Sequence, residues 1–311
     1  MIALVSGGHG FIGKSVVKEL MLHSEIKTIV VASRSGADYW SHDCGTNKWT
    51  ILHDYMDLSV DDSVINVLDT HRPNYIFHLG ANPTVKKEIG CRISDTNILG
   101  THHLLEYCEP GTRFAFASSA TVYGDGYGAE DIAPSPTSVY AATKVASEAL
   151  VDGYTSLGKI SSVIFRLVAN VGGLATHGVL VDLYRKLRSD SPELELLGEY
   201  PGSKKPYTYV GDTARFIVNT TLDASLAGKV NVMPYDAGYL SIDSIADLLM
   251  QTVGIRKPKK WLGEGANWAG DQKELRVAAE KALFWGFHPE YPSSKLAVLK
   301  AARELMGRHD S

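Results

Sequence analysis

The sequence has few cysteines, no long apolar run and no surplus of positive charge. Its 311 residues include three cysteines, Cys44, Cys91 and Cys108, whose wide spacing excludes a disulfide framework or a zinc-finger set. We expect them to be small buried thiols. Lys+Arg 31 against Asp+Glu 35 leaves a net charge of -4, which argues against a polyanion-binding protein and predicts no nucleic-acid partner.

Membrane and metal signals are missing as well. The apolar run Ile2–Val5 gives way at once to glycines and has no basic region before it, so it does not resemble a signal peptide. Nowhere do about 18 uncharged apolar residues follow one another. The 11 histidines show no metal-ligand spacing. We therefore expect a cytoplasmic protein without a membrane or metal partner.

What the first half of the sequence does show is a regular alternation between two kinds of hydrophobic pattern. Short β-branched or aromatic runs indicate buried strands, and amphipathic stretches between them indicate helices. This alternation predicts a Rossmann-type doubly wound α/β fold, a parallel sheet with helices on both faces. The expected strands are Ile2–Val5, Lys27–Ser33, Lys48–Leu52, Asn74–Leu79, Arg113–Ser118 and Ser162–Leu167, and the expected helices are Phe11–Leu22, Val60–Thr70, Ser94–Tyr107 and Ser138–Leu157.

The pattern changes after about residue 170, where glycine, proline and tyrosine cluster in Asn170–Gly178 and Gly198–Gly211. We predict a dinucleotide-binding domain over residues 1–169 and a smaller, α-rich substrate lobe over residues 170–311. The segment of about 205–230 is expected to pack back onto the first domain. The helices expected in the second part are Val179–Arg188, Ile242–Val253 and Ser294–Met306.

A glycine-rich turn joins the first expected strand to the first expected helix. The segment from Val5 to Gly13 reads V-S-G-G-H-G-F-I-G and fits both G-x-x-G-x-x-G and G-x-G-x-x-G. A pyrophosphate needs backbone N–H groups at a helix N-terminus and glycines that let the backbone come close. In this strand–turn–helix context, the pattern predicts a dinucleotide site in preference to a plain tight turn.

The end of the second expected strand bears on the choice between NAD and NADP. An NAD site usually has an acid about 20 residues beyond the glycines, which bonds the ribose 2′-hydroxyl. Here no acid occurs until Asp38, and Ser33 and Arg34 offer groups that suit a 2′-phosphate. The sequence thus favours NADP over NAD, with Arg34 as a solvated cation stacking on adenine as the alternative. Asp57, followed by Leu58, is placed either to bond the adenine amino group or to form part of the N-terminal cap region of the next helix.

A tyrosine–lysine pair offers acid/base chemistry. Three Y-x-x-x-K matches occur, but two span a proline, and only Tyr140 and Lys144 lie in an alanine-rich helical run. There, positions i and i+4 share a face, so the lysine ammonium is expected to lower the pKa of Tyr140. A phenolate of this kind takes a proton from a sugar or alcohol hydroxyl. Ser119 follows the C-terminal end of a strand, where ligands bind in open parallel sheets, and is the expected orienting partner.

These residues together resemble the extended short-chain dehydrogenase/reductase family, particularly its NAD(P)-dependent sugar-nucleotide epimerases and dehydratases. The likeness covers most of the chain, and the order and spacing of the motifs are more specific than any one motif. The matching segments are the Gly7–Gly13 turn, His78–Ala81, Asn97–Thr101, Ser118–Gly124, Tyr140–Lys144, Phe165–Leu167, Asn170–Gly172, Tyr207–Asp212 and Trp285–Pro289.

The resemblance implies a role for each residue that matches a motif. It makes Tyr140 the catalytic acid/base, Lys144 the residue that lowers its pKa and holds the nicotinamide ribose, and Ser119 the ligand of the substrate oxygen. It also implies a homodimer formed through helices 94–107 and 138–157. The implied substrate-binding residues are Thr121, Asn170 and Lys205. The implied cofactor-binding residues are Gly7, Gly8, Gly10, Phe11, Ile12, Gly13, Ser33, Arg34, Asp57, Leu58, Leu79, Gly80, Ala81, Asn97, Tyr140 and Lys144.

The chain also departs from its relatives. Dehydratases carry an acidic pair where this chain has Ala120 and Thr121, so 4,6-dehydration is not expected. The version present looks like UDP-galactose 4-epimerase, although that type has an acid at the second strand. Arg276 is a weak substitute for an arginine that contacts phosphate in the C-terminal lobe.

Three functions remain open from the sequence. The first is an NAD(P)-dependent nucleotide-sugar epimerase that oxidises a sugar hydroxyl, at C4, to a transient keto group. The second is an NADPH-dependent reductase of a nucleotide-linked keto-sugar, which Arg34 favours. The third is a non-enzymatic NADP-binding protein, against which the Ser119, Tyr140 and Lys144 set argues.

Overall fold

The chain is divided into two units in the computed structural model, which describes residues 1–34, 49–83, 92–236, 238–263 and 272–309. Asp38, Cys44 and Cys91 lie outside these residues, whereas Cys108 is buried as expected. Residues 123–137 belong to the second unit, which the sequence did not indicate. The functional division at residue 169 stays a prediction. The first unit comprises Met1–Val122, Ser138–Arg166 and Ala214–Val230, and the second comprises Tyr123–Thr137, Leu167–Thr213 and Asn231–Ser311.

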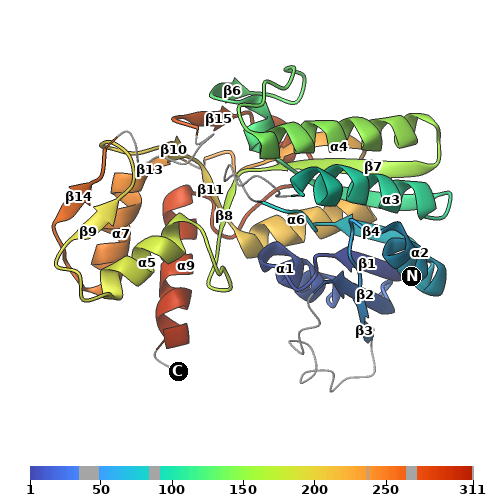
Figure 1. Ribbon diagram of the computed structural model, residues 1–311, viewed down its shortest axis with the longest axis horizontal. Coiled ribbons are helices and arrows are strands. Elements are labelled where there is room, and N and C mark those ends of the chain that lie inside the picture. Colours follow the sequence, from blue (N-terminus) through green and yellow to red (C-terminus); the bar gives the residue numbers. More distant parts are fainter. Residues whose placement is uncertain (35–48, 84–91, 237, 264–271, 310–311) are drawn as a thin grey trace. The chain divides into compact units, whose positions relative to one another are not determined.

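A seven-stranded sheet carries the first unit (Figure 1). Its strands are β1 (Ile2–Ser6), β2 (Thr28–Ser33), β3 (Thr50–Tyr55), β4 (Tyr75–His78), β5 (Thr112–Ser119), β7 (Ile160–Leu167) and β12 (Gly228–Val232). They lie in the order β12-β7-β5-β4-β1-β2-β3, and the pairing is parallel from β3 across to β5. Because the chain first builds outward from β1 to β3 and then returns to β4, the strand order reverses between β1 and β4. Ligands bind at such a reversal in sheets of this kind.

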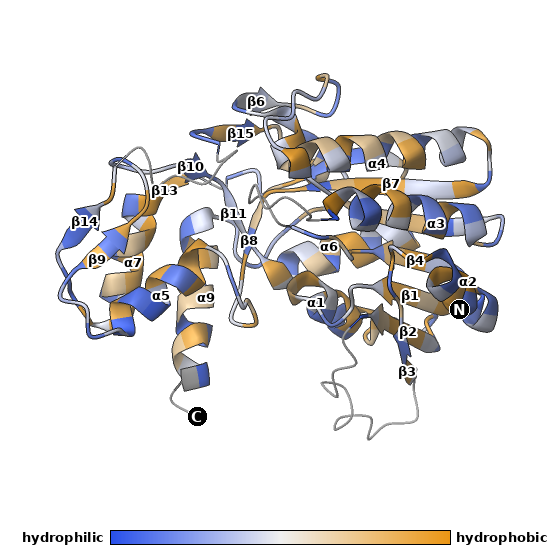
Figure 2. Cartoon of the chain, in the orientation of Figure 1, coloured by the Kyte–Doolittle hydropathy of each residue, from blue (hydrophilic) through white to orange (hydrophobic). Residues whose placement is uncertain are grey.

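Helices cover both faces of this sheet. One face packs against α2 (Asp61–His71), α3 (Gly100–Tyr107) and α4 (Val139–Ser156). In Figure 1, α1 (Phe11–Leu20) and α6 (Val210–Leu222) lie on the other side of the sheet from α3 and α4. Since neither face meets water, the central strands are hydrophobic throughout and appear orange in Figure 2. The predicted Rossmann-type fold is therefore confirmed.

The helix expected over Ser94–Tyr107 is interrupted. A π-helical turn over Asp95–Leu99 precedes α3. The backbone carbonyl of Asn97 accepts hydrogen bonds from the hydroxyls of Thr101, at 2.6 Å, and Ser147, at 2.8 Å. These two hydroxyls tie the π-helical turn to α3 and α4. The predicted pairing of this helix and α4 between two copies of the chain stays a prediction.

The described part of the second unit contains several very short strands, the short helix α8 (Glu280–Phe284) and three longer helices that form its core. Helices α5 (Val179–Arg188), α7 (Ile242–Val253) and α9 (Ser294–His309) share a hydrophobic core. The short strands were not predicted, because segments of two or three residues show no clear period. They pair as β6 (Gly126–Gly128) with β15 (Leu275–Val277), β8 (Ala169–Val171) with β11 (Tyr207–Tyr209), β9 (Leu194–Leu196) with β14 (Lys259–Trp261), and β10 (Lys204–Lys205) with β13 (Leu240–Ser241).

Candidate active site

The glycine-rich turn between β1 and α1 is shaped by close backbone approaches. Gly7 has a φ of +70°, and a Cβ built there would lie 2.7 Å from the Cα of Gly80. A Cβ on Gly13 would lie 2.2 Å from the carbonyl oxygen of Gly7. Gly10 is the N-cap residue of α1, and the N–H groups of the first turn, at Phe11 and Ile12, have no intrahelical acceptor. The turn therefore has the close backbone packing and the free helix N-terminus that the predicted pyrophosphate site needs, and the binding itself stays a prediction.

A cavity of about 450 Å³ opens beside this turn. It brings six of the predicted cofactor residues together and adds Ala32, Met56 and Thr96, which no motif marked. The cavity combines apolar walls with the Ser33 hydroxyl and the Arg34 guanidinium, a surface that fits an adenosine with its phosphates. The predicted residues among its lining are Gly7, Ser33, Arg34, Leu58, Gly80 and Ala81.

Asp57 turns back onto its own segment. Its carboxylate accepts hydrogen bonds from the N–H of Ser59, at 3.0 Å, and from the Ser59 hydroxyl, at 2.7 Å. Burial opposes ionisation here, but these bonds and the charge of Arg34 hold the pKa of Asp57 below its usual value. The N-cap residue of α2 is Val60, and the N–H of Asp57 donates to the hydroxyl of Ser63 in the first turn of that helix, at 2.9 Å, so Asp57 lies in the N-terminal cap region. Its contact with adenine stays a prediction.

Asn97 holds the segment after β4 against α4. Its side-chain oxygen accepts the N–H of Asn82, at 2.7 Å. Its amide donates to the carbonyl oxygen of Asn82, at 3.1 Å, and to the Thr143 hydroxyl, at 3.0 Å. Both amide protons are used within the protein, so the side chain positions α4. The structure gives no direct support to the predicted cofactor contact of Asn97. Leu79, the residue after β4, is half-buried.

The three predicted catalytic residues lie on two elements of the first unit that a hydrogen bond joins, β5 and α4. Ser119 is the last residue of that strand, and Tyr140 and Lys144 lie in the first turns of α4. The Lys144 ammonium donates to the carbonyl oxygen of Ala117, at 2.7 Å, which fastens α4 to β5 two residues before Ser119. Thr121 donates to the Ser119 hydroxyl oxygen through its own hydroxyl, at 2.9 Å, and through its N–H, at 3.2 Å.

The pKa of Tyr140 differs from the expectation. Its ring centroid lies 5.9 Å from the Lys144 nitrogen, yet burial raises the pKa of Tyr140 to about 12. Burial also lowers the pKa of Lys144 to about 8, against the opposing effect of Glu148. The predicted lowering of the Tyr140 pKa was therefore wrong for this state of the chain, because the ammonium is directed at a backbone carbonyl and the phenol loses solvation.

A buried ion pair supports the same helix, and sequence reasoning missed its main residue. Glu148 lies one turn beyond Lys144 and accepts the Ser118 hydroxyl at 2.5 Å. Arg166 of β7 donates to its two carboxylate oxygens at 3.0 and 2.7 Å. Both side chains are almost completely buried. The available signal was the i+4 spacing from Lys144, which places Glu148 on the same inward face.

His78 is a second buried group near Lys144. Ser6 lies 2.7 Å from its Nδ1, and Thr101 lies 3.0 Å from its Nε2. Since the Thr101 hydroxyl donates to the carbonyl oxygen of Asn97, Nε2 carries the imidazole proton and Nδ1 accepts from Ser6. Burial, with the charge of Lys144, lowers the pKa of His78 to about 3, so this imidazole stays neutral.

The predicted substrate residues are distributed over both units. Thr121 follows Ser119 in the first unit, whereas Asn170 and Lys205 belong to the second. The Asn170 side chain accepts the Thr213 hydroxyl at 2.6 Å and donates to the carbonyl oxygen of Val168 at 3.0 Å. Arg276, the weak candidate for a phosphate contact, is paired with Glu274 at 2.7 Å.

Comparison with known proteins agrees with this geometry. The model of the NAD dependent epimerase/dehydratase family matches residues 3–232. A curated dTDP-glucose 4,6-dehydratase of Neisseria gonorrhoeae is 24% identical over 250 residues, covering 74% of this chain and 71% of the relative. An uncharacterized UDP-glucose epimerase of Bacillus subtilis is 27% identical over 295 residues, covering 89% of this chain and 92% of the relative.

Solved structures show the same fold. The UDP-glucose 4-epimerase of Thermus thermophilus, in complex with NAD, aligns with a TM-score of 0.84 and 22% identity, covering 99% of each chain. No helix among the described residues is long and apolar enough to cross a membrane. Because the family model spans most of the chain, including the glycine turn and the Ser119, Tyr140 and Lys144 set, the chain belongs to the NAD dependent epimerase/dehydratase family.

Proposed function

We propose that the protein is an NAD(P)-dependent nucleotide-sugar epimerase that inverts C4 of the sugar through a transient keto group. The observation that carries this proposal is the attachment of Lys144 to Ala117. It holds the helix of Tyr140 at the strand end that presents Ser119. This set lies in the same unit as the dinucleotide cavity.

The residues of the chain divide the proton chemistry between them. Tyr140 accepts the proton of the sugar hydroxyl in the oxidising step and donates it back in the reducing step. Because the Ser119 oxygen already accepts from Thr121, the Ser119 hydroxyl proton is directed to another acceptor, which we assign to the sugar oxygen. In the proposed reaction the Lys144 ammonium, whose nitrogen lies 5.9 Å from the centre of the Tyr140 ring, opposes the burial that raises the Tyr140 pKa. When bound, the nicotinamide supplies the acceptor and donor of the hydride.

Ala120 and Thr121 favour epimerisation over dehydration. Eliminating water from C5 and C6 needs a second acid and base beside the tyrosine, and neither residue titrates. An NADPH-dependent reductase of a nucleotide-linked keto-sugar is the second candidate. Ser33 and Arg34 in the cavity wall favour it, because they suit the 2′-phosphate of NADP. Cells keep NADP largely reduced, as a reductase requires.

The two candidates are separated by isotope retention and cofactor consumption. With a nucleotide sugar that carries deuterium at C4, we expect the epimerised product to retain the label without net use of cofactor. Loss of the label to NADP, or stoichiometric oxidation of NADPH with a keto-sugar, would instead support the reductase. Tyr140→Phe should lower turnover by about 10²–10⁴-fold, while the variant still binds the cofactor. A Tyr140→Phe variant that keeps full activity would overturn the catalytic assignment.

A further inference from the structure

A buried carboxylate lies one helical turn beyond Lys144, and the proposed acid/base steps do not use it. Glu148 and Lys144 are four residues apart, so their side chains share the buried face of α4. Both bind the same stretch of β5. The Lys144 ammonium donates to the carbonyl oxygen of Ala117, at 2.7 Å, and the Glu148 carboxylate accepts the hydroxyl of Ser118, at 2.5 Å. The two charged groups are therefore held against neighbouring residues of one strand.

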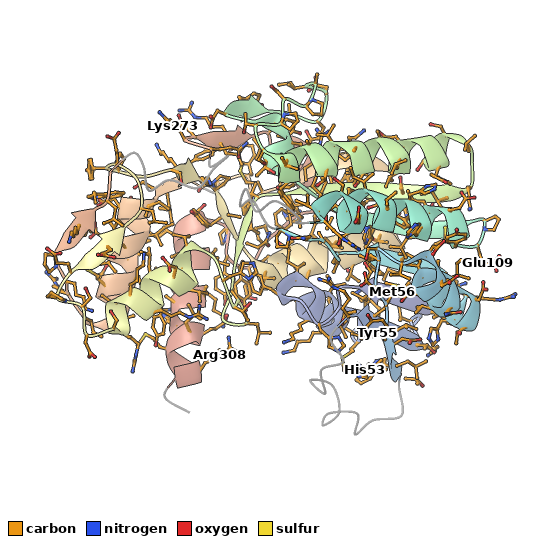
Figure 3. The ribbon with its side chains drawn as sticks, in the orientation of Figure 1. His53, Tyr55, Met56, Glu109, Lys273 and Arg308 are labelled. Carbon is orange, nitrogen blue, oxygen red and sulfur yellow. The ribbon has the colours of Figure 1, made fainter. Side chains whose placement is uncertain are left out.

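A third buried charge approaches the carboxylate from β7. Arg166 donates to the two oxygens of Glu148, at 3.0 and 2.7 Å, and the side chains of this pair are only 2% and 3% exposed. In Figure 3, α4 runs along β7, the strand that carries Arg166. Lys144 is as deeply buried as the pair. Because water is kept from all three groups, their charges act on one another more strongly than they would at the surface.

The ionisable groups around Lys144 differ in the charge that they carry. His78 of β4 is neutral, since burial and the charge of Lys144 lower its pKa to about 3. The Tyr140 phenol is neutral as well, since burial raises its pKa to about 12. Glu148 opposes the effect of burial on the pKa of Lys144, so the negative end of the Glu148 and Arg166 pair acts on the ammonium.

Resting on the proposed epimerase chemistry, in which the Lys144 ammonium acts on Tyr140, we propose that Glu148 is a positioning residue that keeps Lys144 charged at neutral pH. Arg166 and the Ser118 hydroxyl hold the carboxylate in its ionised form. A lysine buried to this degree without a counter-charge releases its proton below neutral pH. Glu148 thus acts on the reaction through Lys144, in addition to joining α4 to β7.

The pH dependence of stability tests this proposal without substrate. Stability that depends on the Lys144 proton begins to rise at the pKa of Lys144 in the folded chain, about 8. We call this pH the onset. It is measured by urea unfolding of each variant against its own Lys144→Met derivative, which cancels structural losses that do not involve the Lys144 proton.

Removing either charge of the pair should move the onset, in opposite directions. Glu148→Gln leaves the Arg166 guanidinium without the carboxylate, so the onset should fall by about one pH unit or more, for charges about 6 Å apart at an effective permittivity of about 20. Arg166→Met leaves the carboxylate to act on Lys144 alone, so the onset should rise. The double variant removes opposite charges, and its onset should return most of the way to that of the natural chain.

A second carboxylate of α4 provides the matched control. Asp152 lies two turns beyond Lys144, is half exposed and pairs with Lys229. Asp152→Asn should leave the onset unchanged, because solvent screens this charge. Damage to packing predicts a different result for the double variant, since a second buried substitution then adds to the effect of the first and does not reverse it.

An onset that is the same in Glu148→Gln, Arg166→Met and the natural chain would overturn the proposal. If Glu148→Gln does not fold, the rise in Arg166→Met and its reversal in the double variant decide the question. Unfolding involves no sugar, so this outcome is independent of the isotope experiment on epimerisation. In turnover, the ammonium is the active form and is lost as pH rises, so the alkaline limb of the pH profile should move with the onset. A limb that stays in place while the onset moves would overturn the role of Glu148 in the reaction.

Discussion

At the scale of single residues, Lys144 is a potentially charged side chain in surroundings that disfavour its charge. Its side chain is buried, and it is held by a carbonyl oxygen and by the ring of Phe116, 4.8 Å away. Burial disfavours the ammonium and lowers the pKa of Lys144 to about 8 from 10.5. The proposed mechanism needs that charge beside Tyr140, so on this proposal the site keeps a group that costs stability.

This conflict predicts a pH-dependent stability. Between pH 8 and 10.5 the unfolded chain still holds the Lys144 proton that the folded chain has released, so folded-state stability rises with pH across this window. Lys144→Met lacks this effect. We expect the unfolding free energy of the variant, relative to the natural chain, to fall by about 3 kcal/mol between pH 7 and 10.5. Urea unfolding at both pH values measures it.

An exposed lysine of α9 provides the matched control. Lys295→Met removes the same charge from a solvated side chain, and its effect on stability should be nearly the same at both pH values. A pH-independent difference between Lys144→Met and the natural chain would show that Lys144 stays protonated when buried. Such a result would contradict the claim that burial lowers the pKa of Lys144.

At the scale of elements, α4 is positioned by the ion pair of Glu148 and Arg166. Glu148→Gln leaves the Arg166 guanidinium buried without its counter-charge, and we expect a loss of about 3 kcal/mol in unfolding free energy. Replacing both partners, as Glu148→Leu with Arg166→Met, should cost less than the sum of the two single changes. Additive single-variant effects in this double-mutant cycle would contradict the coupling.

The same element shows how far sequence reasoning reaches. The helix of α4 and its neighbouring strands could be predicted, because buried parallel strands are apolar throughout and α4 begins at a Ser138 cap. The positions of Gly7, Ser119 and Tyr140 in the fold could be predicted, because each motif lies directly after a predictable strand or inside a predictable helix. The Glu148 pair could not, since its partner is on another strand and only the fold brings them together.

The direction of the Tyr140 pKa was outside sequence reasoning for a related reason. A Y-x-x-x-K spacing places the ammonium and the phenol on one face of a helix, but it does not say which acceptor the ammonium chooses. The nearby carbonyl of Ala117 on β5 settles that choice.

At the scale of the whole molecule, the chain leaves the first unit and returns to it through residues 214–230. Arg113, buried at the start of β5, joins this returning segment to the sheet. Its Nε donates to the carbonyl oxygen of Thr221, at 2.9 Å, and its Nη2 donates to those of Asp223, at 2.9 Å, and Leu226. The Thr221 and Asp223 carbonyls lie at the C-terminal end of α6, where helix carbonyls lack partners and the dipole favours a cation, and the Leu226 carbonyl lies in the loop that follows.

Arg113→Met tests this connection. The variant keeps an apolar stem but leaves several buried carbonyls without donors, so we expect a loss of about 3 kcal/mol or more in unfolding free energy. Hydrogen exchange should speed up first in α6 and β12. Arg72→Met, an exposed side chain in the same region of the sheet, should change stability by less than about 0.5 kcal/mol. If the two variants are equally stable, the returning segment is held by hydrophobic contacts, such as that of Phe216 with Phe165, and not by Arg113.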